Sequence, residues 1–156
     1  MIPFVDLKAQ YQSIKPEIDA AIADVITNTA FISGKYAKQF EASFSQYSRN
    51  KHTIACANGT DSLEILLQAM GISEGDEVIV PALTWISTSE TVTSAGATPV
   101  FIDVDEYFTM DVAQLESKIS DRTRLIMPVH IYGHPANMPA IMEIATLSWW
   151  RLMDLK

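Results

Sequence analysis

Apolar positions keep a helical spacing in the first third of the chain and then change to short runs. The spacing predicts a helix that opens at Pro16, because proline in a first turn sacrifices no hydrogen bond. A second helix is predicted before His52. The apolar faces of the two helices comprise Ile18, Ala21, Ile22, Val25 and Ile26 in the first and Tyr36, Phe40, Phe44 and Tyr47 in the second.

From His52 onward, short apolar runs alternate with amphipathic segments. Such alternation is typical of parallel βαβ units and predicts an α/β fold. The expected strands lie near 53–57, 77–80, 99–103 and 124–129, and the expected helices near 60–70, 86–95, 111–119 and 138–146.

Residues that begin or end helices support this order. Gly71 and Gly96 follow predicted helices as left-handed stops. Ser87 with Glu90, and Asp111 with Gln114, have the spacing of capping boxes. Asp103 and Asp105 end a predicted strand, where paired acids more often cap or turn than catalyse.

Charge and composition exclude several classes of function. The net charge is −8 and the Lys and Arg residues are scattered, which disfavours a nucleic-acid partner. No run approaches the ~18 apolar residues of a membrane span and the first residues do not resemble a leader, so we expect a cytoplasmic protein. Cys56 is the single cysteine and is expected to be a small buried core residue. The histidines His52, His130 and His134 lack metal-ligand spacing and are interpreted as structural, so no metal site is expected.

Candidate chemistry gathers at a turn between an expected strand and a helix, Ala55-Cys56-Ala57-Asn58-Gly59-Thr60. Gly59 lets a ligand approach the backbone, Thr60 adds a hydroxyl, and the first N–H groups of a helix attract an anion. The sequence therefore predicts a phosphate site, although a tight turn capped by Asn58 or Thr60 explains the same residues without a ligand. Trp85 follows the next strand, at the sheet edge where α/β folds bind ligands, but a lone tryptophan is more often core.

This turn occurs in a fixed order with four other segments. The others are Gly71-Ile72-Ser73-Glu74-Gly75-Asp76-Glu77-Val78-Ile79-Val80-Pro81, Pro81-Ala82-Leu83-Thr84-Trp85, Gly96-Ala97-Thr98-Pro99-Val100-Phe101-Ile102-Asp103-Val104-Asp105 and Pro128-Val129-His130-Ile131-Tyr132-Gly133. Together they resemble the DegT/DnrJ/EryC1/StrS family of nucleotide-sugar aminotransferases from Pro3 to about Ala145. The resemblance implies part of a type I aminotransferase large domain, which has three layers around a mostly parallel sheet. It also implies pyridoxal 5′-phosphate as cofactor, with Gly59 and Thr60 around its phosphate and Trp85 stacked on its ring.

The resemblance further implies amino transfer to a nucleotide-linked keto-sugar, with glutamate as donor, in the biosynthesis of amino sugars for polysaccharides or secondary metabolites. It implies a homodimer whose active site lies close to the connector Asn28–Gly34, where the apolar pair Phe31-Ile32 needs cover.

No residue of this chain matches the family's Schiff-base lysine or the aspartate that pairs the pyridine nitrogen. Lys35, Lys38, Lys51, Lys118 and Lys156 lie elsewhere and are interpreted as surface charges, so no catalytic residue is assigned and the chain alone is expected to be inactive. Two alternatives remain open: a non-catalytic relative or inert truncation product with a binding or regulatory role, and an unrelated phosphate-binding α/β module.

The last ten residues depart from the family pattern. We expect residues 1–146 to be the N-terminal part of the cofactor domain, and 147–156 to be an aberrant tail. Tryptophan has the single codon TGG, so Trp149-Trp150 read one base out of frame encodes a more ordinary apolar run. A frameshift after about Thr146 is the hypothesis, and a gene sequence in which no alternative frame restores an aspartate-containing strand would refute it.

Overall fold

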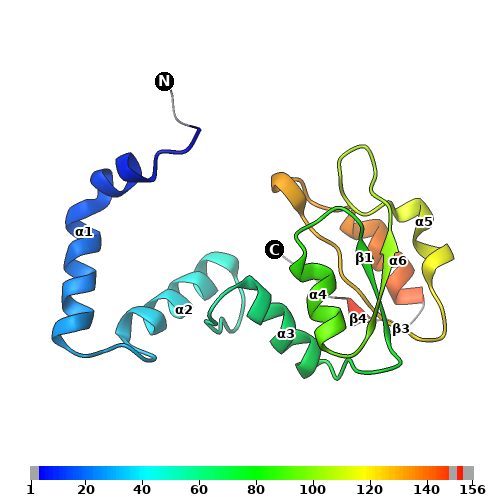
Figure 1. Ribbon diagram of the computed structural model, residues 1–156, viewed down its shortest axis with the longest axis horizontal. Helices are drawn as coiled ribbons and strands as arrows, with labels where there is room; N and C mark the ends of the chain where they lie inside the picture. The colour runs from blue at the N-terminus through cyan, green and yellow to red at the C-terminus, as the bar shows by residue number, and fades with distance from the viewer. Residues whose placement is uncertain (1–3, 148–150, 153–156) are drawn as a thin grey trace. The chain divides into compact units, whose positions relative to one another are not determined.

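The computed structural model describes residues 4–147 and 151–152, in two compact units that comprise residues 1–55 and 56–156 (Figure 1). Across the described residues, no helix is both long enough and apolar enough to cross a membrane.

The first unit consists of α1 (Leu7–Thr27) and α2 (Lys35–Ser48). The expectation that the first helix opens at Pro16 was wrong, because the carboxylate of Asp6 accepts a hydrogen bond of 2.9 Å from the N–H of Ala9 and so caps the helix earlier. Pro16 lies inside α1. No residue of either helix is buried, so the predicted apolar faces stay exposed.

An ion pair between α1 and α2 closes the connector that joins them. An ion pair of 2.8 Å joins Lys35 at the start of α2 to Asp24 near the end of α1. Between them, Phe31 is 67% exposed and Ile32 is 90% exposed, as an uncovered apolar pair.

The second unit contains a sheet of β1 (Glu77–Pro81), β2 (Thr98–Ile102), β3 (Thr123–Ile126) and β4 (Arg151–Leu152). The strands lie in the order β2-β1-β3-β4, and every neighbouring pair is parallel. This arrangement confirms the predicted parallel α/β fold.

Helices cover both faces of the sheet, which makes three layers (Figure 1). Val78 and Val80 of β1 pack in one core cluster with residues of α3 (Gly59–Ala69) and α4 (Ser87–Ser94). Ile79, between them, packs in the opposite cluster with residues of α5 (Val112–Lys118) and α6 (Met138–Leu147). Successive strand residues face opposite sides, so β1 contributes to both cores.

The strand expected near 53–57 does not form. The segment pairs with no strand within the described residues, and a strand depends on such pairing. Ala55 instead donates its N–H to a carboxylate oxygen of Glu41 in α2, at 2.9 Å. The expectation of a buried Cys56 was therefore also wrong: the thiol is exposed, and its sulfur lies 3.1 Å from the hydroxyl of Ser62.

The expected helix ends are mostly confirmed. Gly71 and Gly96 have φ of 73° and 83°, the left-handed conformation in which a side chain is strained. Asp111 caps α5 by accepting from the N–H of Ala113 at 3.0 Å, and its carboxylate also accepts from the Gln114 amide. The predicted box of Ser87 with Glu90 is wrong, since α4 begins without a side-chain cap.

Of the segment expected to be an aberrant tail, residues 148–150 and 153–156 lie outside the described structure. Arg151 and Leu152 form β4, which pairs in parallel with Leu125 and Ile126 of β3.

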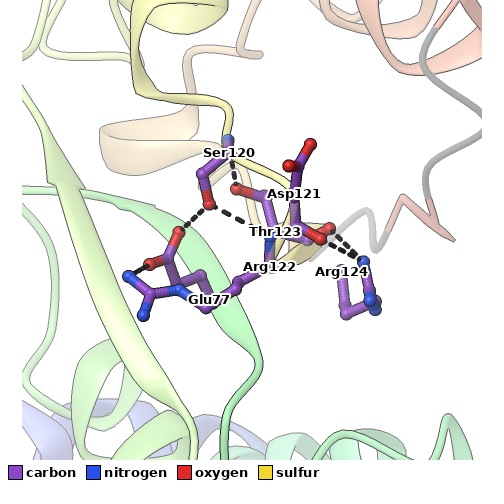
Figure 2. Close-up of polar contacts among 6 residues, drawn as sticks. All are labelled: Glu77, Ser120, Asp121, Arg122, Thr123 and Arg124. Atoms are coloured by element: carbon purple, nitrogen blue, oxygen red, sulfur yellow. Dashed lines mark hydrogen bonds and ion pairs between the residues drawn. The ribbon is translucent and has the colours of Figure 1, made fainter.

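A buried carboxylate anchors the amino end of β1 to the loop that leads into β3 (Figure 2). Glu77 is 7% exposed and lies 2.5 Å from both the hydroxyl of Ser120 and the guanidinium of Arg122. Its backbone N–H also donates to the carbonyl of Arg122, at 2.9 Å. The hydrogen bond from Ser120 lowers the pKa of Glu77 below its ordinary 4.5, against the effect of burial, and Arg122 lowers it further.

We predict that Glu77→Gln lowers the free energy of unfolding at pH 7 by about 1–2 kcal/mol, because the charged hydrogen bonds are lost. The pKa of Glu77 is lower in the folded than in the unfolded protein. Its charge therefore stabilises the fold fully above about pH 4.5, and this contribution disappears as the pH falls through the lowered pKa. Urea unfolding at neutral and acid pH measures the difference.

Glu116→Gln is the matched control, since Glu116 is exposed on α5 and should change stability little at either pH. A Glu77→Gln effect of the same size at acid pH would contradict the role of the charge.

Candidate functional site

The first turn of α3 presents backbone donors at one end of the second unit. Asn58 precedes the helix in an extended conformation, and its side chain accepts from the N–H of Asp61 at 3.0 Å. Its carbonyl accepts from the N–H of Ser62 at 3.1 Å. Within the described part of the chain, the N–H groups of Gly59 and Thr60 donate to no acceptor. Two donors at the positive end of the helix dipole are thus available to an anion.

Gly59 leaves open space in front of this turn. A Cβ built on Gly59 would meet nothing within 4 Å, and its φ lies outside the left-handed region. Neither backbone conformation nor packing in this unit requires a glycine. A ligand that comes close to the backbone fits the residue that is present.

A second segment begins at the carboxyl end of β1. The chain leaves the sheet after Pro81 and reaches α4 through Trp85, whose side chain is 77% exposed. The alternative interpretation, that Trp85 is a buried core residue, is therefore wrong for this unit. Its indole face is free for contact with a flat ring.

A hydrogen bond joins the two segments. The hydroxyl of Thr60 in α3 lies 2.7 Å from the hydroxyl of Ser87, the first residue of α4, across 27 positions of sequence. The two helices contact each other and lie side by side (Figure 1). The structure thus brings the predicted phosphate residues next to the segment that carries Trp85.

Sequence reasoning missed Ser87 as part of this site. Its distance of three residues from Glu90 indicated a helix cap, whereas its hydroxyl bonds to Thr60. The serine hydroxyl was the available signal, but its partner depends on the packing of α3 against α4.

The donors at this site are neutral. N–H groups and hydroxyls supply them, and Asp61 places a carboxylate in the first turn of α3. Such donors, at the positive end of a helix dipole, have the chemistry suited to a phosphate ester.

Other residues weighed from the sequence have structural roles. His130 accepts from the N–H of Ala136 at 2.9 Å, and the ring of His134 stacks on Tyr107 at a centroid distance of 5.0 Å. Asp105 forms a turn by accepting from the backbone N–H of Tyr107 and from the backbone and hydroxyl of Thr109, as expected. Burial raises the pKa of Asp105, but these hydrogen bonds outweigh it and lower the pKa below its ordinary value.

In the second unit, the described lysine lies away from this site. Among the described residues of the second unit, Lys118 is the one lysine, and it lies in the last turn of α5. That turn leads into the amino end of β3, the opposite edge of the sheet from Trp85. Lys35 pairs with Asp24, and Lys15 with Asp19, in the first unit.

Comparison with known proteins identifies the family of the chain. Residues 12–149 match the DegT/DnrJ/EryC1/StrS aminotransferase family. A pleiotropic regulatory protein of Geobacillus stearothermophilus is 46% identical over 145 residues, which are 92% of this chain and 39% of that protein. The UDP-N-acetyl-3-dehydro-α-D-glucosamine 3-aminotransferase of Acidithiobacillus ferrooxidans is 43% identical over 154 residues, 98% of this chain and 42% of that enzyme.

The fold agrees with the sequence match. The crystal structure of Streptomyces venezuelae DesV in complex with a ketimine intermediate superposes with a TM-score of 0.94 at 40% identity, over 98% of this chain and 42% of DesV. The chain therefore spans about two fifths of the length of these relatives. Solved relatives include one recorded with the cofactor form PMP bound, and pyridoxal 5′-phosphate is the cofactor of these enzymes. The fold, the ordered motifs and the match over most of its length show that this chain belongs to the DegT/DnrJ/EryC1/StrS aminotransferase family.

Proposed function

We propose that this chain is the N-terminal, cofactor-binding part of a pyridoxal phosphate-dependent aminotransferase that acts on a nucleotide-linked keto-sugar. Gly59 and Thr60 bind the cofactor phosphate, and Trp85 stacks on the pyridine ring. The observation that carries the proposal is the hydrogen bond between Thr60 and Ser87, because it joins the anion-binding turn to the segment of the exposed indole.

Each residue has a distinct task in this proposal. Gly59 lets the phosphate approach the backbone closely, since nothing occupies the space where a Cβ would stand. The N–H groups of Gly59 and Thr60 and the hydroxyl of Thr60 donate to phosphate oxygens. Trp85 covers one face of the ring and shields it from water. The bound cofactor supplies the electron sink that amino transfer requires.

The substrate class follows from the relatives. The enzyme from Acidithiobacillus ferrooxidans is named for a UDP-linked keto-sugar, and a relative from Streptomyces venezuelae, 43% identical over 145 residues, for a dTDP-linked amino sugar. We extend this class to the present protein, with glutamate as the amino donor and a cytoplasmic place of action. In this proposal residues 1–146 are cofactor-domain sequence and 147–156 an aberrant tail.

Thr60→Val and Trp85→Leu should each weaken binding of pyridoxal phosphate. Loss of one hydrogen bond to a charged group costs about 1.5–3 kcal/mol, and loss of a stacking partner about 0.5–1.5 kcal/mol. Calorimetric titration of the 156-residue chain measures both effects. Trp85→Phe should retain most of the affinity, because a flat aromatic face remains.

Thr93→Val is the matched control for Thr60, since the Thr93 hydroxyl bonds within α4 to the carbonyl of Ser89. Unchanged affinity in both Thr60→Val and Trp85→Leu would place the cofactor elsewhere.

The chain alone should bind the cofactor without turning over a keto-sugar nucleotide. Within the second unit, Lys118 lies at the amino end of β3, away from Trp85, so it is not placed to hold the cofactor covalently. Borohydride should therefore fix no cofactor stoichiometrically at a single lysine, beyond the scattered labelling of exposed lysines that the aldehyde gives with any protein. Stoichiometric, borohydride-stable labelling of one lysine of the chain would overturn this assignment.

A separate experiment addresses a second candidate function, a non-catalytic binding or regulatory role. The name of the Geobacillus stearothermophilus relative, a pleiotropic regulatory protein, favours it. If the protein that carries this chain in full binds the cofactor and keto-sugar nucleotides but forms no amino sugar, the regulatory role replaces the catalytic one.

We further propose that the protein functions as a homodimer with the connector Asn28–Gly34 near the active site. The support is the uncovered pair Phe31 and Ile32, together with two helices that bury none of their residues. Phe31→Ser with Ile32→Ser should shift sedimentation from dimer toward monomer. Phe108→Ser, at a 52% exposed aromatic of the second unit, should not. A monomeric unsubstituted protein would refute this proposal.

A further inference from the structure

We infer that Ser87 is a positioning residue, whose hydroxyl donates to Thr60 and thereby directs the Thr60 proton toward a bound phosphate. This inference rests on the proposed phosphate site and adds to it a residue from a different helix. Ser87 itself does not contact the phosphate in this arrangement; it acts through Thr60.

The surroundings of Ser87 restrict its hydroxyl. Ser87 is 7% exposed, so water has little access to it. The distance of 2.7 Å to the Thr60 hydroxyl is that of a well-formed O–H···O bond. Among the described residues, Thr60 is the hydrogen-bond partner of the Ser87 hydroxyl. The backbone carbonyl of Ser87 is already used, because it accepts from the hydroxyl of Thr91 at 2.8 Å.

Proton counting then gives Ser87 its role. A hydroxyl has one proton to donate and two lone pairs to accept with, so one of the two hydroxyls donates in their shared bond. If Thr60 donates to Ser87, Thr60 has no proton left for an anion. If Ser87 donates to Thr60, the Thr60 proton is free to point at a phosphate oxygen. A phosphate accepts hydrogen bonds at this position, so its binding selects the second arrangement.

The selected arrangement is a relay of donors from Ser87 to Thr60 to the phosphate. Each bond in such a chain polarises the next and strengthens it. The buried Ser87 also restrains rotation of the Thr60 hydroxyl before the ligand arrives, which reduces the cost of ordering it. A purely structural bond between α3 and α4 would give neither effect.

The test compares ligands with and without a phosphate. In calorimetric titrations of the 156-residue chain, Ser87→Ala should weaken pyridoxal phosphate and inorganic phosphate about threefold to tenfold, the loss of one neutral hydrogen bond. Binding of pyridoxal, which has no phosphate, should not change. Ser87→Thr keeps the hydroxyl and should restore phosphate affinity.

Ser89→Ala is the matched control on the same helix, because the Ser89 hydroxyl bonds to the carbonyl of Ile86 and not to α3. In the Thr60→Val background, Ser87→Ala should have no further effect on phosphate affinity, since its action passes through Thr60.

The outcomes separate this inference from the proposed function. If the unsubstituted chain binds neither phosphate nor pyridoxal phosphate, the proposed site and the role of Ser87 both fall. If it binds both but Ser87→Ala binds them equally well, only the positioning role falls. Equal weakening of pyridoxal and pyridoxal phosphate would assign Ser87 to packing alone and overturn the inference.

Discussion

The central strand β1 is the constraint on which the second unit depends. All five of its residues are buried, and it pairs in parallel with β2 on one side and β3 on the other. Parallel pairing forces each connection to cross back over a face of the sheet. It also places the carboxyl ends of all the strands at the same edge. The segment that carries Trp85 leaves β1 at that edge, so its position follows from the pairing of β1.

Much of this unit could be predicted because local and long-range signals agree. Val78, Ile79 and Val80 form a continuous apolar run, as expected of a strand covered on both faces, and Gly71 and Gly96 mark where the preceding and following helices end. The strand near 53–57 could not be excluded from its residues. A strand exists by pairing, and no sequence pattern states whether a partner is present.

The candidate site likewise contains residues that the sequence predicted and one that it did not. Gly59, Thr60 and Trp85 were predicted as site residues from their places beside expected elements and from the family resemblance, and the structure puts Thr60 next to the helix that follows Trp85. Ser87 was misread as a helix cap because capping depends on near neighbours, whereas its partner is 27 positions away. Pro16 was misread for the opposite reason: its helix-opening preference is real, but Asp6 supplies a stronger cap upstream. Polar side chains have several possible partners, and tertiary packing decides among them.

The open space at Gly59 means that stability and function favour different residues at this position. Alanine has a higher helix propensity than glycine, and an alanine side chain here would meet no atom within 4 Å. Alanine at this position is therefore compatible with the ligand-free fold. Under the proposed function the glycine serves the occupied state and not the empty one, so stabilising substitutions chosen without regard to ligands would be expected to remove it first.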